Sequence, residues 1–441
     1  MSFTGFSFIL RRMSGPGQEH RPETRGTAET REGGQTSRVG RQFRFGLRPM
    51  VARNTEEPHR ASTPLELLFD LCFVVAVSQA ARELNDSLSR NHFSSGFVGY
   101  VTVFFAIWWA WVNFTWFASA YDTDDAAYRL LTFVQIVGVL ILAAGVPAAF
   151  VHGDFTVMTI GYVVMRVALV TQWLRAAAGD PMGRSAARRY AAAVTAVQVG
   201  WVARLFVPHM AGELAFPVLA LAEMLVPAWA ERGGRGTSWH AEHISERYGL
   251  FTLIVLGECV AAATVAMQSA TSSGLSAPQV GVATGGLLLI FGLWWWYFEH
   301  PSEEGLRESR SSAFLWGYTH YAVFASVAAL GAGLEVAVES TRRGSGVSPT
   351  TAGAAVAISV AVYLVVTGAV QVRLNPTGVL KTRFIIPFAA VILVVGWSAR
   401  ALTIGFALPI LGLIVVGLVL LDRLVPTLHR VVDDPSTPSL A

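Results

Sequence analysis

Glu66, Asp70 and Glu258 are acidic residues inside long apolar stretches of the sequence. Glu66 and Asp70 occur four residues apart within residues 63–79, so a helix places them on one face. Glu258 lies in a second apolar stretch, residues 246–260. A carboxylate inside a bilayer costs on the order of a few kcal/mol unless it faces protein or water. We therefore expect Asp70 and Glu258 to face a common interior cavity, where either could take up a proton or hold a cation.

Structural pairing is the alternative for these two acids. Buried charges need partners. Arg166 and Arg204 lie within other apolar stretches, so they are the candidate partners of Asp70 and Glu258. The sequence leaves a functional site and a structural ion pair equally open.

Other polar residues in apolar stretches have weaker functional signals. Glu66 could relay ions or protons to the acid one turn further on, or could accept the free N–H groups of a helix start that Pro64 marks. Glu223 and Glu335 are isolated acids, and Asn113 lies in a Trp-rich stretch. For these last three, hydrogen bonding between helices is the favoured interpretation.

His240 and His243 are the only candidates for metal binding, and they are weak ones. Their spacing puts both on one helical face, but no fuller zinc signature accompanies them. A solvated segment that caps the following helix is the preferred interpretation, so no metal and no cofactor is expected. The sequence has no phosphate-binding glycine loop, serine elbow or CxxC motif, and it gives little support for enzyme chemistry or nucleic-acid binding.

The composition is that of a membrane protein with many spans. Of 441 residues, 53% are hydrophobic and 14% are charged, against roughly 25% charged in soluble domains. A bilayer-crossing helix needs about 20 apolar residues. Stretches of this kind occur at residues 64–83, 96–120, 129–150, 154–174, 188–208, 213–231, 247–268, 278–299, 312–338, 350–373, 381–399 and 401–421.

The basic residues orient these spans. Alternate loops hold fifteen Arg and Lys residues on one side and five on the other. Because basic loops stay in the cytoplasm, both termini are predicted to be cytoplasmic. Residues 1–61 form an Arg-rich segment without the apolar residues that a core needs, so we expect a disordered tail there. One hypothesis places the native start at Met50.

The two halves of the chain resemble each other. The cluster Trp108-Trp109 recurs as Trp295-Trp296, 187 residues later, and Cys72 and Cys259 have the same offset. Six helices per repeat leave both repeats in the same orientation. The predicted fold is therefore an all-α polytopic membrane protein of about twelve transmembrane helices in two parallel six-helix repeats. Its predicted parts are the tail 1–61, the repeats 62–235 and 236–424, and a short cytoplasmic tail 425–441.

Several motifs together resemble the bacterial low temperature requirement protein A family. They lie at residues 65–77, 121–129, 243–260, 294–300 and 316–335. The resemblance implies a multi-pass protein of the bacterial inner membrane that is linked to growth in the cold. It does not imply a defined biochemical activity.

Two functional hypotheses follow from the sequence. The first is a transporter or channel for a small solute or cation, with Glu66, Asp70, Asn113 and Glu258 along its path. The second is a non-transporting protein, either a lipid-modifying enzyme or a scaffold for cold adaptation. Membrane lipids and a small solute or cation are the expected partners.

Overall fold

The chain is described from a computed structural model, which covers most of the predicted bundle. The described residues are 48–55, 57, 60–232, 236–270, 274–299, 302–308, 310–374 and 379–432. Most of the predicted N-terminal tail and residues 433–441 of the C-terminal tail therefore lie outside the described residues. Within the described part, every regular element is a helix.

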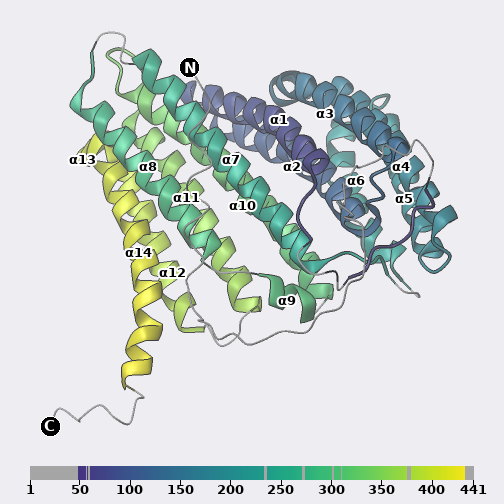
Figure 1. The fold of residues 1–441 in the computed structure, drawn as a ribbon. Coiled ribbons are helices and arrows are strands. Elements are labelled where there is room, and N and C mark those ends of the chain that lie inside the picture. Colours follow the sequence, from purple (N-terminus) through teal and green to yellow (C-terminus); the bar gives the residue numbers. More distant parts are fainter. Residues whose placement is uncertain are drawn as a thin grey trace, which may run out of the picture. The chain divides into compact units, whose positions relative to one another are not determined.

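Over the described residues, a long helix lies at each of the twelve predicted spans, and two short helices lie between them (Figure 1). The helices are α1 Pro64–Ser89, α2 Phe93–Tyr121, α3 Ala126–His152, α4 Thr156–Gly179, α5 Arg184–Arg204, α6 His209–Ala230, α7 Ala241–Ala270, α8 Ala277–Phe298, α9 Glu303–Glu308, α10 Arg310–Ser340, α11 Pro349–Leu374, α12 Val379–Trp397, α13 Ala399–Leu402 and α14 Ile404–Val432.

Ten of these helices, counted over the described residues, are long and apolar enough to cross a bilayer. The two that fall short are α5 and α12. Helix α5 carries four arginines, and the described apolar part of α12 covers only residues 384–397. The prediction of an all-helical protein with many spans is confirmed, with ten helices meeting the requirements of a span.

Helix α1 begins where the sequence places a strong start signal. The backbone N–H of Glu66 donates to Thr63 Oγ1 at 3.3 Å, and that of Thr63 donates to Glu66 Oε2 at 2.8 Å. Pro64 occupies the first helical position, where its missing N–H is not needed. This capping box fixes where α1 starts and holds the Glu66 carboxylate beside the helix start.

Small residues let neighbouring helices approach closely. A methyl group added at Gly138 of α3 would come within 2.7 Å of the Gly161 carbonyl of α4, and one added at Gly161 would meet Gly138 in return. Helices in a bilayer associate largely through such close packing, because lipid is as apolar as the side chains.

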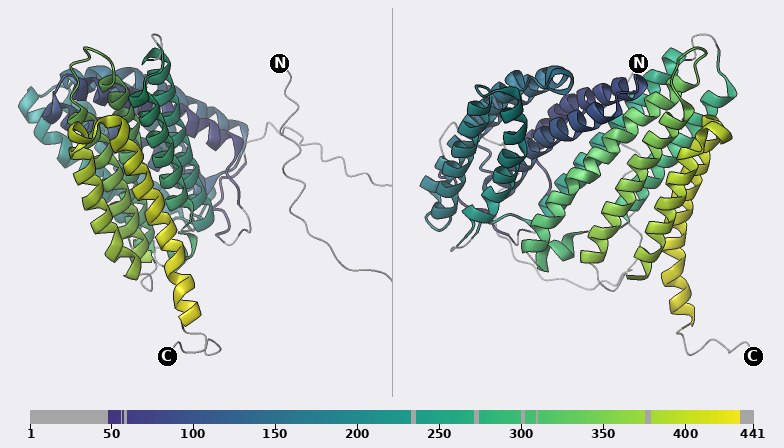
Figure 2. Two further views of the ribbon diagram at one scale, coloured as in Figure 1. Left: turned by 90° about the vertical axis from the view of Figure 1, so that its left-hand side faces the viewer. Right: turned by 180° about the vertical axis from the view of Figure 1, so that it is seen from behind.

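The helices pack in a similar order within each half of the chain. In the first half α1 contacts α3, α3 contacts α4, and α4 contacts α5; in the second half α7 contacts α10, α10 contacts α11, and α11 contacts α12. Helix α8 also packs along α14, whose end extends past its neighbours (Figure 2). The halves meet where α1 and α2 contact α7 and α10.

Helices α1, α7 and α10 run parallel to one another at this contact. Along α1, Asp70 bonds to Arg247 of α7, Ser78 bonds to Glu258 of α7, and Asn85 bonds to Glu335 of α10. We call the end of the bundle where these three helices begin the start side, and the opposite end the far side.

The segment just before α1 packs against the start side. Met50 is fully buried, and Arg60 is only 6% exposed. The Arg60 guanidinium donates to the carbonyls of Ala118, at 2.9 Å, and Ser119, which are free acceptors at the end of α2. The packed part of the chain thus starts before the boundary predicted at residue 61. The reason is that the Arg60 guanidinium supplies hydrogen bonds to the last carbonyls of α2.

Candidate functional site

A cluster of ionisable side chains is buried between α1 and α7 on the start side. Arg247 Nη2 donates to Asp70 Oδ1 at 2.5 Å, and Arg247 Nε donates to Asp70 Oδ2 at 3.1 Å. Arg247 Nη1 also lies 3.0 Å from Glu66 Oε1, and His243 Nε2 lies 3.2 Å from the same oxygen. None of the four side chains is exposed. We call these four residues the ion network.

Helix α2 completes the ion network. Trp111 Nε1 donates to Asp70 Oδ1 at 2.7 Å, and Arg247 Nη2 lies 3.4 Å from Thr115 Oγ1. Asp70 therefore accepts three hydrogen bonds, from Arg247 and Trp111, which compensates for the loss of water around a buried carboxylate.

The charges of the ion network do not balance on fixed groups alone. It contains two carboxylates but one guanidinium, and a buried unbalanced charge is strongly unfavourable. One proton, on His243 or on either carboxylate, would balance the cluster.

The partners of Asp70 differ from those predicted. Arg166 lies 3.3 Å from both carboxylate oxygens of Glu223, which also accepts from Trp109 Nε1 at 2.8 Å. Arg204 donates to the Gly212 carbonyl at 2.7 Å and lies over the Phe155 ring. Neither arginine reaches Asp70, since both belong to helices in the outer part of the first half. Arg166 and Glu223 instead form a buried pair of their own.

Arg247 was not identified from the sequence as a partner of the acids, because this residue lies at the very start of the predicted span 247–268. Arg247 lies in the second turn of α7, four residues after His243, so the two side chains share a helical face. That face meets Glu66 and Asp70, which have the same spacing on α1. The sequence did contain a signal for this contact: an acidic pair four residues apart on one helix and a basic pair with the same spacing on another.

The segment with His240 and His243 was predicted to be solvated, and this prediction is wrong. His240 is 2% exposed and His243 is fully buried, so this segment is not solvated. The His240 backbone N–H donates to Ser119 Oγ at 3.0 Å. In the described part of the chain, no three His, Cys, Asp or Glu side chains gather as metal ligands would.

Glu258 lines a cavity on the far side. The cavity has a volume of about 600 Å³ and lies between α1, α7 and α10. Its polar lining residues are Ser78, Gln79, Arg82, Asn85, Glu258, Glu335, Glu339 and Arg342. We call it the far-side cavity. A small recess beside it, about 10 Å³ in volume, shares Ser78, Arg82, Glu258 and Glu335 with it.

Each acid of the far-side cavity is positioned by a polar side chain of α1. Ser78 Oγ donates to Glu258 Oε1 at 2.5 Å, and Asn85 Nδ2 donates to Glu335 Oε2 at 2.7 Å. Ser89 Oγ donates to Glu339 Oε2 at 2.8 Å. The polar residues of α1 thus lie along a single face of the helix, and that face meets the acids of α7 and α10.

Asp70 and Glu258 do not share a cavity, contrary to the expectation from the sequence. Asp70 is fully buried in the ion network, whereas Ser78, which bonds to Glu258 in the far-side cavity, lies about 12 Å further along α1. The offset of 187 that aligns the Trp clusters would set Glu258 level with Leu71. Glu258 instead lies beside Ser78, about two turns further on.

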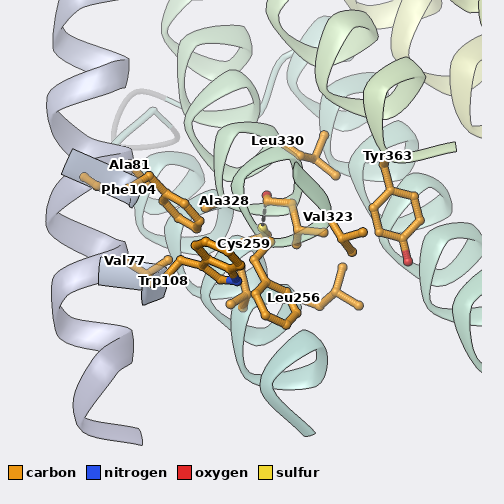
Figure 3. Close-up of a cluster of buried hydrophobic side chains, with 14 of the residues drawn as sticks. Val77, Ala81, Phe104, Trp108, Leu256, Cys259, Val323, Ala328, Leu330 and Tyr363 are labelled. Carbon is orange, nitrogen blue, oxygen red and sulfur yellow. Dashed lines mark hydrogen bonds between the residues drawn. The ribbon is translucent and has the colours of Figure 1, made fainter. Parts of the chain in front are cut away.

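An apolar layer separates the two sites. Phe73 and Val77 of α1 and Val255 of α7 are fully buried there. Figure 3 shows Val77, Trp108, Leu256 and Cys259 gathered in this layer. Val77 and Cys259 also line the recess beside Glu258, so the layer closes the cavity toward the start side.

Asn113 lies outside both sites. Its side-chain amide donates to the Trp109 carbonyl at 2.7 Å, one turn earlier on the same helix. It is absent from the lining of the far-side cavity. The bond is local to α2, so Asn113 does not join the two halves.

Charged groups of the connecting segments cover the ion network on the start side. Burial and, to a lesser extent, the nearby Glu66 carboxylate raise the pKa of Asp122 to about 6, against the opposing effect of Arg53 and Arg60. A hydrogen bond from Arg53 lowers the pKa of Glu57. Arg53 Nη1 lies 3.4 Å from Asp122 Oδ2, so it links the segment before α1 to the end of α2.

The fold and these sites define the class of the molecule. A bundle of helices with ten candidate spans, exposed apolar faces and charges kept in its interior is an integral membrane protein.

The chain belongs to the bacterial low temperature requirement A protein family, whose model matches residues 61–421. A similar chain is the uncharacterized protein RA0937 of Rhizobium meliloti (strain 1021). It is 27% identical over 291 residues, which cover 62% of this chain and 68% of that protein. Residues 61–421, which the family model matches, contain both the ion network and the far-side cavity.

Proposed function

We propose that this protein transports a small polar solute or cation across the bacterial cytoplasmic membrane, between its two halves. The far-side cavity is the observation that carries the proposal. It brings together three glutamates and Arg82 of α1, α7 and α10, with Arg342 just past the end of α10. Charged groups at such depth are costly unless they serve a water-filled path or a polar ligand.

The distribution of basic residues supports an outward orientation of the cavity. Arg175, Arg184, Arg188, Arg189 and Arg232 belong to the start side, by the helix order. Because basic segments remain in the cytoplasm, the start side is cytoplasmic and both termini lie inside. The far-side cavity then opens to the exterior.

The packing order supports a duplicated bundle. The contacts of α1, α3, α4 and α5 in the first half have counterparts in α7, α10, α11 and α12. We infer two parallel repeats, with α5 and α12 as additional spans, making twelve. The cavity and the ion network both lie where the repeats meet, as substrate and coupling sites do in transporters built from repeats.

The ion network provides a closure on the cytoplasmic side. Glu66 and Asp70 of α1 hold Arg247 and His243 of α7, so the start sides of the two repeats are tied together. A proton on Asp70 would weaken its attraction to Arg247 and favour separation of α1 from α7. Opening there while the exterior side closes would give alternating access, with a proton as the coupling ion.

The experiment is transport by the full chain in proteoliposomes, with labelled solutes and with dyes for proton and potassium movement. Glu258→Gln should reduce flux at least tenfold, because it removes the charge at the closed end of the cavity. Asp70→Asn should reduce it similarly. Glu83→Gln is the matched control, since Glu83 is on α1 but does not line the cavity.

Equal flux in the wild type and in Glu258→Gln would contradict the proposal. So would a folded wild-type protein that moves none of the solutes or ions. That second outcome would favour the non-transporting alternative, a lipid-modifying enzyme or a scaffold.

A further inference from the structure

The far-side cavity carries both signs of charge. Its carboxylates belong to Glu258, Glu335 and Glu339, and its guanidinium groups belong to Arg82 and Arg342. Opposite charges at the wall of one cavity can bind opposite charges of a single ligand. The two arginines would weaken the binding of a bare cation, and the three glutamates would weaken the binding of a bare anion.

The charges follow an order along α1. Glu258 is fixed by Ser78 at the end that the apolar layer closes. Arg82 lies one turn further along α1, lines both the cavity and the recess, and has an exposed side chain. Asn85 and its partner Glu335 come next. The inner end of the cavity therefore offers the carboxylates of Glu258 and Glu335 together with the guanidinium of Arg82.

The size of the cavity exceeds what a bare ion requires. Its volume of about 600 Å³ falls within the roughly 300–1,000 Å³ of small-molecule sites. No grouping of three metal ligands occurs among the described residues. Size and lining both favour an organic solute.

We propose that the far-side cavity binds a small zwitterion, with its cationic group at Glu258 and its anionic group at Arg82. The inference rests on the transport function proposed above, because it names the class of solute that this cavity takes. Charge-assisted hydrogen bonds from both ends would fix the orientation of the solute. A carboxylate matches the planar fork of Arg82, and an ammonium group matches the free lone pairs of Glu258.

Binding to the purified full-length protein in detergent tests the proposal without any transport step. Isothermal titration calorimetry compares three probes of one length: 4-aminobutyrate, n-butylamine and butyrate. Glycine adds a zwitterion with a shorter charge separation. At least one zwitterion should bind ten times or more tightly than butylamine and butyrate.

Two variants locate the site. Glu258→Gln and Arg82→Gln should each weaken zwitterion binding at least tenfold, whereas Glu83→Gln should leave it unchanged. Glu258 is half-buried and Arg82 is exposed, so both variants should fold. Thermal unfolding and elution volume of the purified variants check this.

The other outcomes overturn the proposal. Equal affinity for butylamine would make the cavity a cation site, and equal affinity for butyrate would make it an anion site. Failure of both zwitterions to bind the folded wild type would exclude the class. Cation flux without zwitterion binding would contradict this inference alone, and zwitterion binding without flux would contradict only the transport function.

Discussion

Arg247 Nη2 lies 2.5 Å from Asp70 Oδ1 where α1 meets α7, and both side chains are fully buried. This pair joins the two halves of the bundle by a charged contact inside an apolar environment. Removal of one partner of a buried pair leaves the other charge uncompensated, which costs about 3–5 kcal/mol. The same contact therefore holds α1 against α7, and it is the contact that opens in the proposed transport cycle.

Asp70→Asn should destabilise the folded protein by about 3 kcal/mol, because Arg247 then keeps only Glu66 as a charged partner. The measurement is thermal or denaturant unfolding of the purified protein in detergent. Asp124→Asn is the control. Asp124 pairs with Arg129 in an exposed ion pair, which should contribute less than about 1 kcal/mol.

Arg247→Met in the Asp70→Asn background separates charge from packing. If the cost arises from the contact between Asp70 and Arg247, the double variant should lose less stability than the sum of the two single variants. A double variant as unstable as the sum of the single changes would show that the two residues do not interact energetically.

The membrane fold was predictable because it depends on length and hydropathy alone. Ten of the predicted spans, such as residues 64–83, correspond to helices of the described residues that could cross a bilayer, and α1 starts at the Pro64 that marks it. Helix α5 was harder to classify, since its four arginines lower its hydropathy although its length is sufficient.

The site was less predictable because contacts between helices depend on register. Glu66, Asp70 and Glu258 were recognisable as acids in apolar stretches. The residues that face these acids could not be predicted, because a shift of two turns in the register of two helices moves a partner by about 11 Å. Such a shift separates Asp70 from Glu258 and brings Arg247 into reach instead.

Glu223→Gln should destabilise the protein without a specific effect on transport. Glu223 pairs with Arg166 and accepts from Trp109, so the change leaves a buried guanidinium with one fewer charge partner. We expect a loss of about 3 kcal/mol. Flux per amount of folded protein should stay within twofold of the wild type, because Glu223 does not line the far-side cavity. A selective loss of flux at unchanged stability would place Glu223 on the transport path.

Asp122 should make stability depend on pH. Its pKa of about 6 lies above the ordinary 3.8, so the folded state holds the proton more tightly than the unfolded state does. The stabilisation is complete below pH 3.8 and is lost as the pH rises through 6. It amounts to roughly 3 kcal/mol, since a tenfold change in proton affinity is worth about 1.4 kcal/mol.

Unfolding temperatures at pH 5 and pH 8, for the wild type and Asp122→Asn, measure this effect. The asparagine variant should lose less stability between the two pH values than the wild type does. Identical pH dependence would show that Asp122 does not contribute. The charged groups around Asp122 are Glu66, Arg53, Arg60 and Asp124, and all four stay in place in both proteins.

Cysteine labelling should reveal the far-side cavity from the exterior. Gln79 lines the cavity, whereas Ala76, three residues earlier on α1, is fully buried. With Cys72→Ala and Cys259→Ala as the background, Gln79→Cys should react with a membrane-impermeant methanethiosulfonate added outside spheroplasts. Ala76→Cys should react at least tenfold more slowly, because water does not reach it.

Inverted vesicles supply the matching measurement. The apolar layer that includes Val77 and Leu256 separates Gln79 from the start side, so reagent added at the cytoplasmic face should not label Gln79→Cys. Labelling from the cytoplasmic face alone would reverse the orientation inferred from the basic residues. Equal labelling from both faces would mean that water crosses the apolar layer, so the protein would be an open channel in place of a transporter closed at the ion network.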